Sequence, residues 1–181
     1  MDITNIEHVN KLKNITDVQI LINNAGSLSC SSIIDGDMDM LISDMNVNYY
    51  GTINVTRALA PIIAANGGGA ITTISSILAL ASVAGIAGYC ASKAALFSAI
   101  QSMRSELKSK NINVYGIFPG AVDNENSNSD ASQTSSLVMA ENIFEAMLAD
   151  QEYVFPDPMS ESLGEIWSQD PKGLEAKFSS I

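Results

Sequence analysis

A tyrosine and a lysine stand four residues apart in the stretch Tyr89-Cys90-Ala91-Ser92-Lys93. On a helix this spacing places both side chains on one face, within reach of a common ligand. A phenol, with a reference pKa of ~10, accepts protons poorly at neutral pH, but a nearby ammonium group favours the phenolate and lowers that pKa. The pair therefore predicts a general acid/base, although the same spacing also occurs between ordinary residues on a helix surface.

Two hydroxyl side chains precede this pair at the end of a β-branched run, Ala70-Ile71-Thr72-Thr73-Ile74-Ser75-Ser76. Such a run predicts a strand, and a hydroxyl at the carboxyl end of a parallel strand faces the crevice where ligands bind. The segment from residue 77 to residue 88 is small and apolar, which suits it to closing over a ligand. We therefore expect Ser75 or Ser76 to share a pocket with Tyr89.

Short apolar runs alternate with long helical patterns around these residues. Strands are predicted at 18–22, 70–75 and 112–118, and amphipathic helices at 38–63 and 89–109. A short helix at 5–15 precedes them, and a helix at 137–148, a short strand at 153–155 and a helical end at 161–180 follow. Alternating strands and helices are typical of parallel βαβ units, so the predicted fold is α/β, with a Rossmann-like parallel sheet and helices on both faces.

Length and composition favour one domain over residues 1–181, without internal repeats. Residues 123–136 consist almost entirely of Asn, Ser, Asp, Gln and other small or polar residues, so they are predicted to form a loop. Loops at the carboxyl ends of strands carry function in such sheets, and we interpret this one as the substrate-loop region.

The charge distribution excludes several classes of partner. The net charge is −11, and residues 111–181, with 12 acids and 2 bases, contribute −10 of it. No cluster of Lys and Arg is available for phosphates, so neither nucleic acid nor an anionic membrane is an expected partner. The two cysteines, the acid at position 2 and the lack of a long apolar span favour a cytoplasmic protein, and the single histidine, His8, has no neighbours that would make a metal site.

Five motifs occur in order and together span nearly the whole chain. They are Asn23-Asn24-Ala25-Gly26, Asn48 in Val47-Asn48-Tyr49, Ile74-Ser75-Ser76, Tyr89-x-x-x-Lys93 and Pro119-Gly120-Ala121-Val122. Together they resemble the classical short-chain dehydrogenase/reductase family, and each motif lies on the element where that family has it. The joint occurrence is far more specific than any one of the motifs.

The resemblance implies a catalytic role for four residues. Tyr89 would be the acid/base, and Lys93 would lower its pKa while bonding the nicotinamide ribose. Ser76, chosen over Ser75 by the spacing usual in the family, would hold the substrate oxygen. Asn48 would anchor the water that links Lys93 to solvent.

The resemblance also implies a set of cofactor contacts for NAD or NADP. Asn24, Ala25 and Gly26 are similar to the stretch beside the adenine ribose, and Asp2-Ile3 to the acidic strand end beside the adenine ring. The turn around the nicotinamide is represented by Pro119, Gly120 and Val122, and Asn124 stands where the family usually has Thr. An Asn side chain can donate and accept hydrogen bonds at that position.

One departure from the family is large. Members begin with a strand, the glycine-rich turn Thr-Gly-x-x-x-Gly-x-Gly and a helix, because glycine lets the backbone approach the pyrophosphate at a helix N-terminus. Neither Gly67–Gly69 nor the glycines at 85 and 88 follow a strand and open a helix. If Asp2 is aligned as above, the first three strands are absent and the domain is an incomplete, catalytic half. Strand 18–22 then becomes an edge of the sheet, and the affinity for a dinucleotide is expected to be low.

Two functions from different classes follow. The first is an NAD(P)-dependent oxidoreductase that interconverts an alcohol and a carbonyl, with Tyr89 as acid/base and a small molecule as substrate. The alternative is a catalytically silent remnant that acts as an interaction or assembly module. For either, the resemblance implies a homo-oligomer formed through the two long helices.

Overall fold

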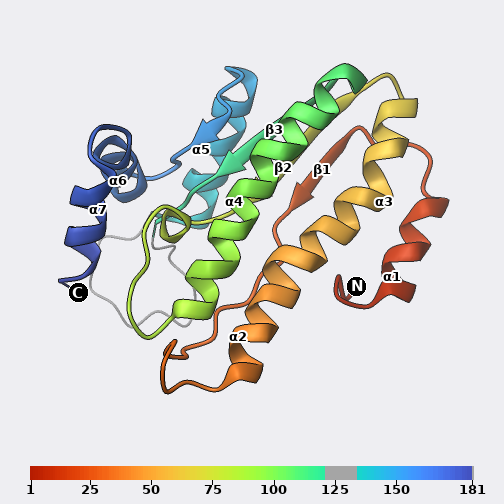
Figure 1. The fold of residues 1–181 in the computed structure, drawn as a ribbon. Helices are drawn as coiled ribbons and strands as arrows, with labels where there is room; N and C mark the ends of the chain where they lie inside the picture. The colour runs from red at the N-terminus through yellow and green to blue at the C-terminus, as the bar shows by residue number, and fades with distance from the viewer. Residues whose placement is uncertain (121–133, 181) are drawn as a thin grey trace.

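The computed structural model describes residues 1–120 and 134–180 and is built on a parallel sheet (Figure 1). Its four strands lie in the order β1-β2-β3-β4. They are β1 (Ile20–Asn23), β2 (Gly69–Ile74), β3 (Ile112–Ile117) and β4 (Tyr153–Val154), and each pairs in parallel with its neighbour. The predicted Rossmann-like α/β fold is confirmed.

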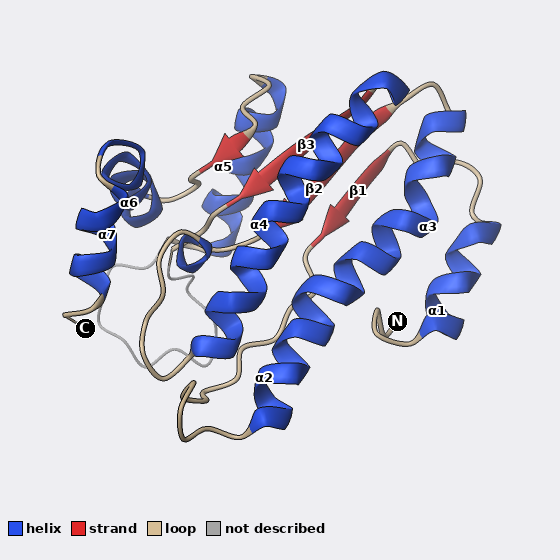
Figure 2. Ribbon diagram, in the orientation of Figure 1, coloured by secondary structure: helices blue, strands red, loops and turns tan. Residues whose placement is uncertain are grey.

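Helices cover both faces of the sheet (Figure 2). On one face lie α3 (Thr52–Ala65) and α4 (Ala87–Leu107), with α1 (Ile6–Lys11) beside α3. The largest core cluster lies here and joins these helices to β1, β2 and β3 through residues such as Val9, Ile63, Ile71 and Ile100. On the other face, α5 (Ser136–Leu148) packs Ala146 against Tyr115, Ile117 and Val154 of β3 and β4.

The helix predicted at 38–63 is a chain of three segments. It comprises α2 (Met38–Asp44), a π-helical segment (Met45–Gly51) and α3. A π segment adds one residue to the helical turn, and a prediction from apolar spacing alone does not detect it and gives one regular helix. The segment contains Asn48, one of the predicted site residues.

The C-terminal end forms two helices, α6 (Pro158–Gln169) and α7 (Pro171–Phe178), where a single helical stretch was predicted at 161–180. Asp170, with φ −146°, breaks the path between them, and Pro171 begins α7 because its missing N–H costs nothing in a first turn. Leu163, Leu174 and Phe178 form a second core cluster with Ile77, supported by Leu78, Leu80 and Val83. The two helices therefore support the segment between Ser76 and Tyr89.

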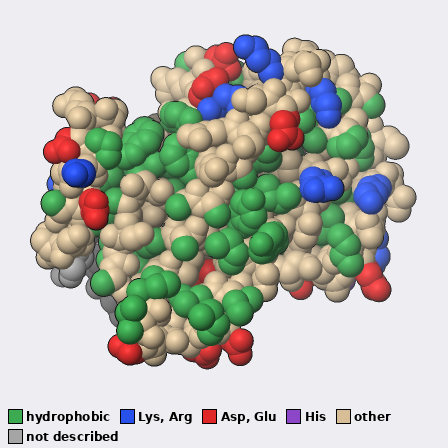
Figure 3. All heavy atoms as spheres, in the orientation of Figure 1, with side chains coloured by type: hydrophobic (Ala, Val, Ile, Leu, Met, Phe, Trp, Pro, Cys, Tyr) green, Lys and Arg blue, Asp and Glu red, His purple; other side chains and the backbone are tan. Residues whose placement is uncertain are grey.

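Apolar surface is concentrated in two places on the face that Figure 3 shows. One lies over the seam between α3 and α4, and the other over α2 and the loop before it, where Ile33, Ile34 and Met38 are exposed. Within the described residues, no helix is both long enough and apolar enough to cross a membrane.

Candidate active site

The carboxyl ends of β1, β2 and β3 meet at one edge of the sheet, where Asn23 is in register with Thr73 and Ile74 with Ile117. The loops that follow these strands enclose a pocket of about 280 Å³ together with the first turns of α4. Its lining includes seven of the predicted site residues: Asn24, Gly26, Ser76, Tyr89, Lys93, Pro119 and Gly120. The structure therefore brings residues from four separate motifs into one cavity.

Lys93 is buried in the wall of this pocket. Its Nζ donates a hydrogen bond of 2.9 Å to the carbonyl oxygen of Ile74 and lies 5.6 Å from the centroid of the Tyr89 ring. Burial removes water from the ammonium group and lowers the pKa of Lys93 from 10.5 to about 8. This lysine can therefore change its charge close to physiological pH.

The environment of Tyr89 differs from the sequence-based expectation. Burial raises the pKa of the Tyr89 phenol, because the phenolate is desolvated, whereas hydrogen bonding to the Ser76 side chain acts in the opposite direction and the charge on Asp44 adds to the increase. The predicted lowering by Lys93 is not found, since the lysine Nζ is directed to the Ile74 carbonyl. Tyr89 therefore stands as a protonated phenol, ready to donate.

Asn48 lies behind the pocket and is fully buried. Its Oδ1 accepts a 2.8 Å hydrogen bond from the Ser27 backbone N–H, and its Nδ2 donates to the Ser27 carbonyl and to Ser92 Oγ, both at 2.8 Å. A Cβ at Gly26 would lie 3.1 Å from Asn48 Oδ1 and 3.7 Å from Lys93 Nζ. The side chain of Asn48 is thus committed to the loop after β1, and glycine at 26 lets that loop pass close to both residues.

The turn after β3 is held from the C-terminal side of the molecule. Asp157, the N-cap of α6, accepts a 2.8 Å hydrogen bond from the Gly120 N–H and further bonds from Ser160. A Cβ at Gly120 would lie 2.8 Å from Asp157 Oδ1, so the turn can approach this carboxylate only with glycine at that position. One buried acid therefore connects Pro119-Gly120 to α6.

Five predicted cofactor residues are not part of the pocket as described. Ile3 and Ala25 line a separate groove beside β1. The exposed carboxylate of Asp2 accepts hydrogen bonds from the backbone N–H and the hydroxyl of Thr4. Val122 and Asn124, like nearly all of the polar loop 123–136, lie outside the described residues.

Sequence reasoning missed two buried acids that hold the pocket, Asp44 and Asp157. For Asp44 there was a usable signal, because it precedes Asn48 by four residues within a stretch of apolar positions. For Asp157 the signal was the sequence Asp-Pro-x-Ser, which is a helix start with a capping residue and proline in the first turn. Among residues 1–120 and 134–180, no three His, Cys, Asp or Glu side chains are grouped in a way that could hold a metal ion.

Comparison with known proteins agrees with this geometry. The family model for short chain dehydrogenases matches residues 1–135. Dehydrogenase/reductase SDR family member 7 of Mus musculus is 30% identical over 169 residues, which cover 88% of this chain and 48% of that protein. The NADP-dependent 3-hydroxy acid dehydrogenase of Schizosaccharomyces pombe is 33% identical over 114 residues, or 62% of this chain and 44% of that protein.

Among solved structures, a short chain dehydrogenase from Burkholderia cenocepacia in complex with NADP superposes with a TM-score of 0.92. It is 30% identical, and the match covers 98% of this chain and 78% of that one. The chain spans about half the length of the mouse relative and less than half of the yeast relative. By the match of the family model to most of its length, the chain belongs to the short chain dehydrogenase family.

Proposed function

We propose that this chain carries the acid/base half of an NAD(P)-dependent oxidoreductase that interconverts an alcohol and a carbonyl compound. The observation that carries the proposal is the pocket in which the Tyr89 phenol, the Ser76 hydroxyl and the Lys93 ammonium converge. A phenol and an ammonium group in one partly buried cavity are suited to moving a proton to or from a small oxygen-bearing substrate.

Each residue has a distinct task in this proposal. Ser76 Oγ holds the substrate oxygen, and Tyr89 Oη donates a proton to that oxygen in reduction or accepts one in oxidation. Lys93 supplies a positive charge 5.6 Å from the centroid of the Tyr89 ring and binds the ribose hydroxyls of the nicotinamide half. Asn48 keeps the loop after β1 in place through Ser27, and this loop closes one side of the pocket.

The pocket fits the nicotinamide end of the cofactor, because Gly26 and Gly120 leave its walls free of side chains at two points and Lys93 supplies a donor. When bound, the cofactor would supply or receive the hydride. The pyrophosphate end would need a glycine turn that follows a strand and opens a helix. These glycines do not form one, since Gly67 to Gly69 join α3 to β2 and Gly85 precedes α4. We therefore infer weak binding of NAD and NADP by this chain alone.

The test is the Tyr89→Phe variant, which removes the hydroxyl and leaves the ring. We expect turnover of alcohols or carbonyl compounds with NAD(P)(H) to fall roughly 10²- to 10⁴-fold while the circular dichroism spectrum stays the same. A matched control is Tyr50→Phe, which removes the hydroxyl of an exposed tyrosine outside the pocket. Activity retained in Tyr89→Phe would contradict the proposal.

The alternative, a catalytically silent assembly module, is favoured by one observation. Ile20 and Ile22 of β1 are exposed, as a surface that binds another polypeptide would be. Fluorescence titration with NADH and NADPH separates the two proposals, because a silent module gives no saturable binding, whereas the oxidoreductase half retains weak binding that Lys93→Met abolishes.

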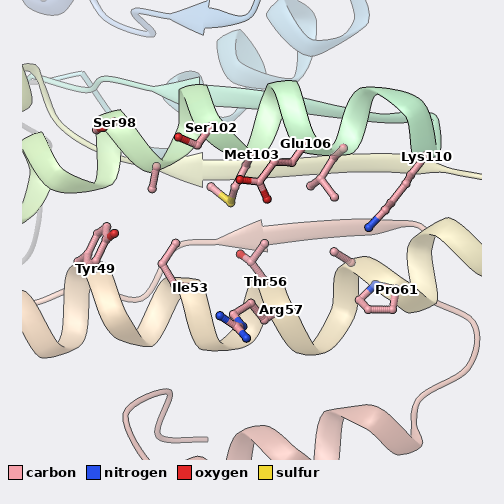
Figure 4. Close-up of a pocket in the computed structure, with 13 residues that line it drawn as sticks. Tyr49, Ile53, Thr56, Arg57, Pro61, Ser98, Ser102, Met103, Glu106 and Lys110 are labelled. Carbon is pink, nitrogen blue, oxygen red and sulfur yellow. The ribbon is translucent and has the colours of Figure 1, made fainter.

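We also propose that the chain forms a homo-oligomer through α3 and α4. A groove of about 460 Å³ runs between the two helices (Figure 4), with Tyr49, Ile53 and Pro61 on one side and Ala99 and Met103 on the other. Arg57 and Glu106 belong to opposite walls of the groove, so a second copy related by a twofold axis can pair each with its opposite charge.

Sedimentation equilibrium tests this assembly. Ala99→Arg places a bulky cation in the groove and should convert the oligomer to a monomer, whereas Ser105→Arg, on an exposed part of α4 outside the groove, should leave the mass unchanged. A monomeric wild-type chain would overturn the proposal.

A further inference from the structure

A fully buried carboxylate, Asp44, lies at the last residue of α2, next to the candidate active site. Asp44 Oδ1 accepts hydrogen bonds of 3.1 Å from Ser27 Oγ, from the Ser29 N–H and from Ser29 Oγ, and Oδ2 lies 3.2 Å from the same Ser29 nitrogen. A buried charge persists only where such donors compensate for the lost water. The loop after β1 is therefore hydrogen-bonded to α2 at two positions, Ser27 and Ser29.

The same carboxylate also faces α4. A Cβ on Gly88 would lie 3.2 Å from Asp44 Oδ2 and 2.9 Å from the Cα of Leu41. Glycine at 88 thus allows α2 to pass directly over the first turn of α4, immediately before Tyr89. The positive end of the α4 dipole favours a negative charge at this place.

We propose that Asp44 is a positioning residue of the acid/base site, which fixes the loop Gly26–Ser29 against the first turn of α4 and holds a negative charge beside Tyr89. This inference rests on the proposed function, because it assigns Asp44 its effect through Tyr89. The charge on Asp44 affects which protonation state of the Tyr89 phenol is favoured. A negative neighbour favours the protonated phenol, which is the form that donates a proton when a carbonyl oxygen is reduced.

Several groups surround Tyr89 in the described residues, and the Ser76 side chain, which hydrogen-bonds to the phenol, opposes the increase in its pKa. Lys93 Nζ lies 5.6 Å from the ring centroid on the next turn of α4, Asp44 approaches the preceding residue, Gly88, from α2, and Cys90 is the neighbour of Tyr89 in the chain. Burial is the largest cause of the raised pKa of Tyr89, and the charge on Asp44 adds to it. Neutralising Asp44 without changing its shape therefore isolates one contribution.

The experiment is a spectrophotometric titration of tyrosinate absorbance in the full chain, with Tyr89 identified by subtracting the curve of Tyr89→Phe. In Asp44→Asn, which is isosteric and uncharged, we expect the Tyr89 midpoint to fall by roughly 0.5–1 pH unit. The matched control is Asp39→Asn, which removes an exposed acid from the same helix and should leave the midpoint unchanged. An unchanged midpoint in folded Asp44→Asn would overturn the electrostatic part of the inference.

A second variant tests the loop and remains informative if Asp44→Asn does not fold. The double variant Ser27→Ala/Ser29→Ala removes two hydroxyl donors and keeps the charge on Asp44. We expect faster amide hydrogen exchange at residues 26–29 with the Tyr89 midpoint close to that of the wild type. Exchange as slow as in the wild type would overturn the positioning role, and a midpoint lowered as far as in Asp44→Asn would show that the charge is not the cause.

Neither measurement depends on turnover. Failure of the proposed function, seen as activity in Tyr89→Phe, therefore leaves both readouts interpretable. Conversely, a functioning enzyme whose Tyr89 midpoint and loop exchange ignore Asp44 would refute this inference alone.

Discussion

Strands β1 and β3 hold the two sides of the same pocket in different ways. β3 lies between β2 and β4, with α4 on one face and α5 on the other, and five of its six residues are buried. β1 pairs with β2 only, among the described residues, and alternates exposed Ile20 and Ile22 with buried Leu21 and Asn23. The loop after β3 is thus supported by packing on both faces of the sheet, whereas the loop after β1 depends on hydrogen bonds that it exchanges with Asn48 and donates to Asp44.

The side chains that are proposed to perform the chemistry therefore lie on the better packed side of the pocket. Ser76 and Tyr89 flank the segment that α6 and α7 cover, and Lys93 contacts the carbonyl of Ile74 at the end of β2. Side chains that must keep their mutual geometry during proton transfer gain from such rigid support. The β1 side contributes a wall without titratable groups to the pocket, for which hydrogen bonds to the backbone suffice.

The largest expected effect comes from truncating the same residue type on the two strands. Ile117 of β3 is 0% exposed and Ile22 of β1 is 61% exposed. Ile117→Ala removes buried methyl groups and leaves a cavity, so we expect it to lower the free energy of unfolding by about 2–5 kcal/mol. Ile22→Ala should change it by less than about 0.5 kcal/mol.

Urea denaturation of both variants measures this contrast. Equal losses would mean that β1 is covered in solution, for example by a second polypeptide, and the comparison between the two strands would fail.

The contrast between the strands also bears on what the sequence could predict. The run at 70–75 is rich in β-branched residues and the run at 112–118 is largely apolar, which predicts strands, and the structure confirms strands there. The run at 18–22 is a nearly continuous apolar stretch, and the prediction that it becomes an edge strand is confirmed, because β1 lies at the edge of the described sheet with Ile20 and Ile22 exposed. The π segment at Met45–Gly51 and the break at Asp170 were missed because both keep helical spacing on either side.

Within the candidate site, side chains carried by motifs were predictable, and those that support them were not. Ser76, Tyr89, Lys93 and Gly120 share the pocket as their spacing and strand ends indicated. The direction of the Tyr89 pKa was predicted wrongly, because a pairwise argument from Lys93 ignored burial. Asp44 and Asp157 act through contacts between elements far apart in sequence, so their local patterns could indicate a buried acid and a helix start but not the partners that these acids hold.

An intermediate effect is expected from Lys93, which is buried at the junction of the two sides. Its folded-state pKa of about 8 lies below the ordinary value of 10.5, so the folded chain releases the proton first as pH rises. Below pH 8 both states are protonated and the full penalty of burying the charge applies, at about 3 kcal/mol. Between pH 8 and 10.5 that penalty disappears, and the contribution of Lys93 to the free energy of unfolding rises with pH.

Lys93→Met removes this dependence and keeps an apolar stem of similar length. We expect the variant to be more stable than the wild type at pH 7 by roughly 1–3 kcal/mol, with a difference that shrinks as pH approaches 10. Because the raised pKa of Tyr89 affects stability only above its ordinary value of 10.0, the comparison is made below that pH. Parallel curves of unfolding free energy against pH for the two proteins would contradict the assignment.

The smallest of these effects concerns the anchor on the β3 side. Asp157→Ala removes the acceptor for the Gly120 and Ser160 N–H groups and the N-cap of α6, so we expect a loss of about 1–2 kcal/mol in unfolding free energy. The matched control is Asp170→Ala, because Asp170 is also an N-cap before proline but makes no capping hydrogen bond from its side chain. It should change the free energy by less than about 0.5 kcal/mol. If the two variants lose the same amount, the Pro119-Gly120 turn is held by the sheet alone, and the two sides of the pocket differ more sharply than the hydrogen bonds of Asp157 imply.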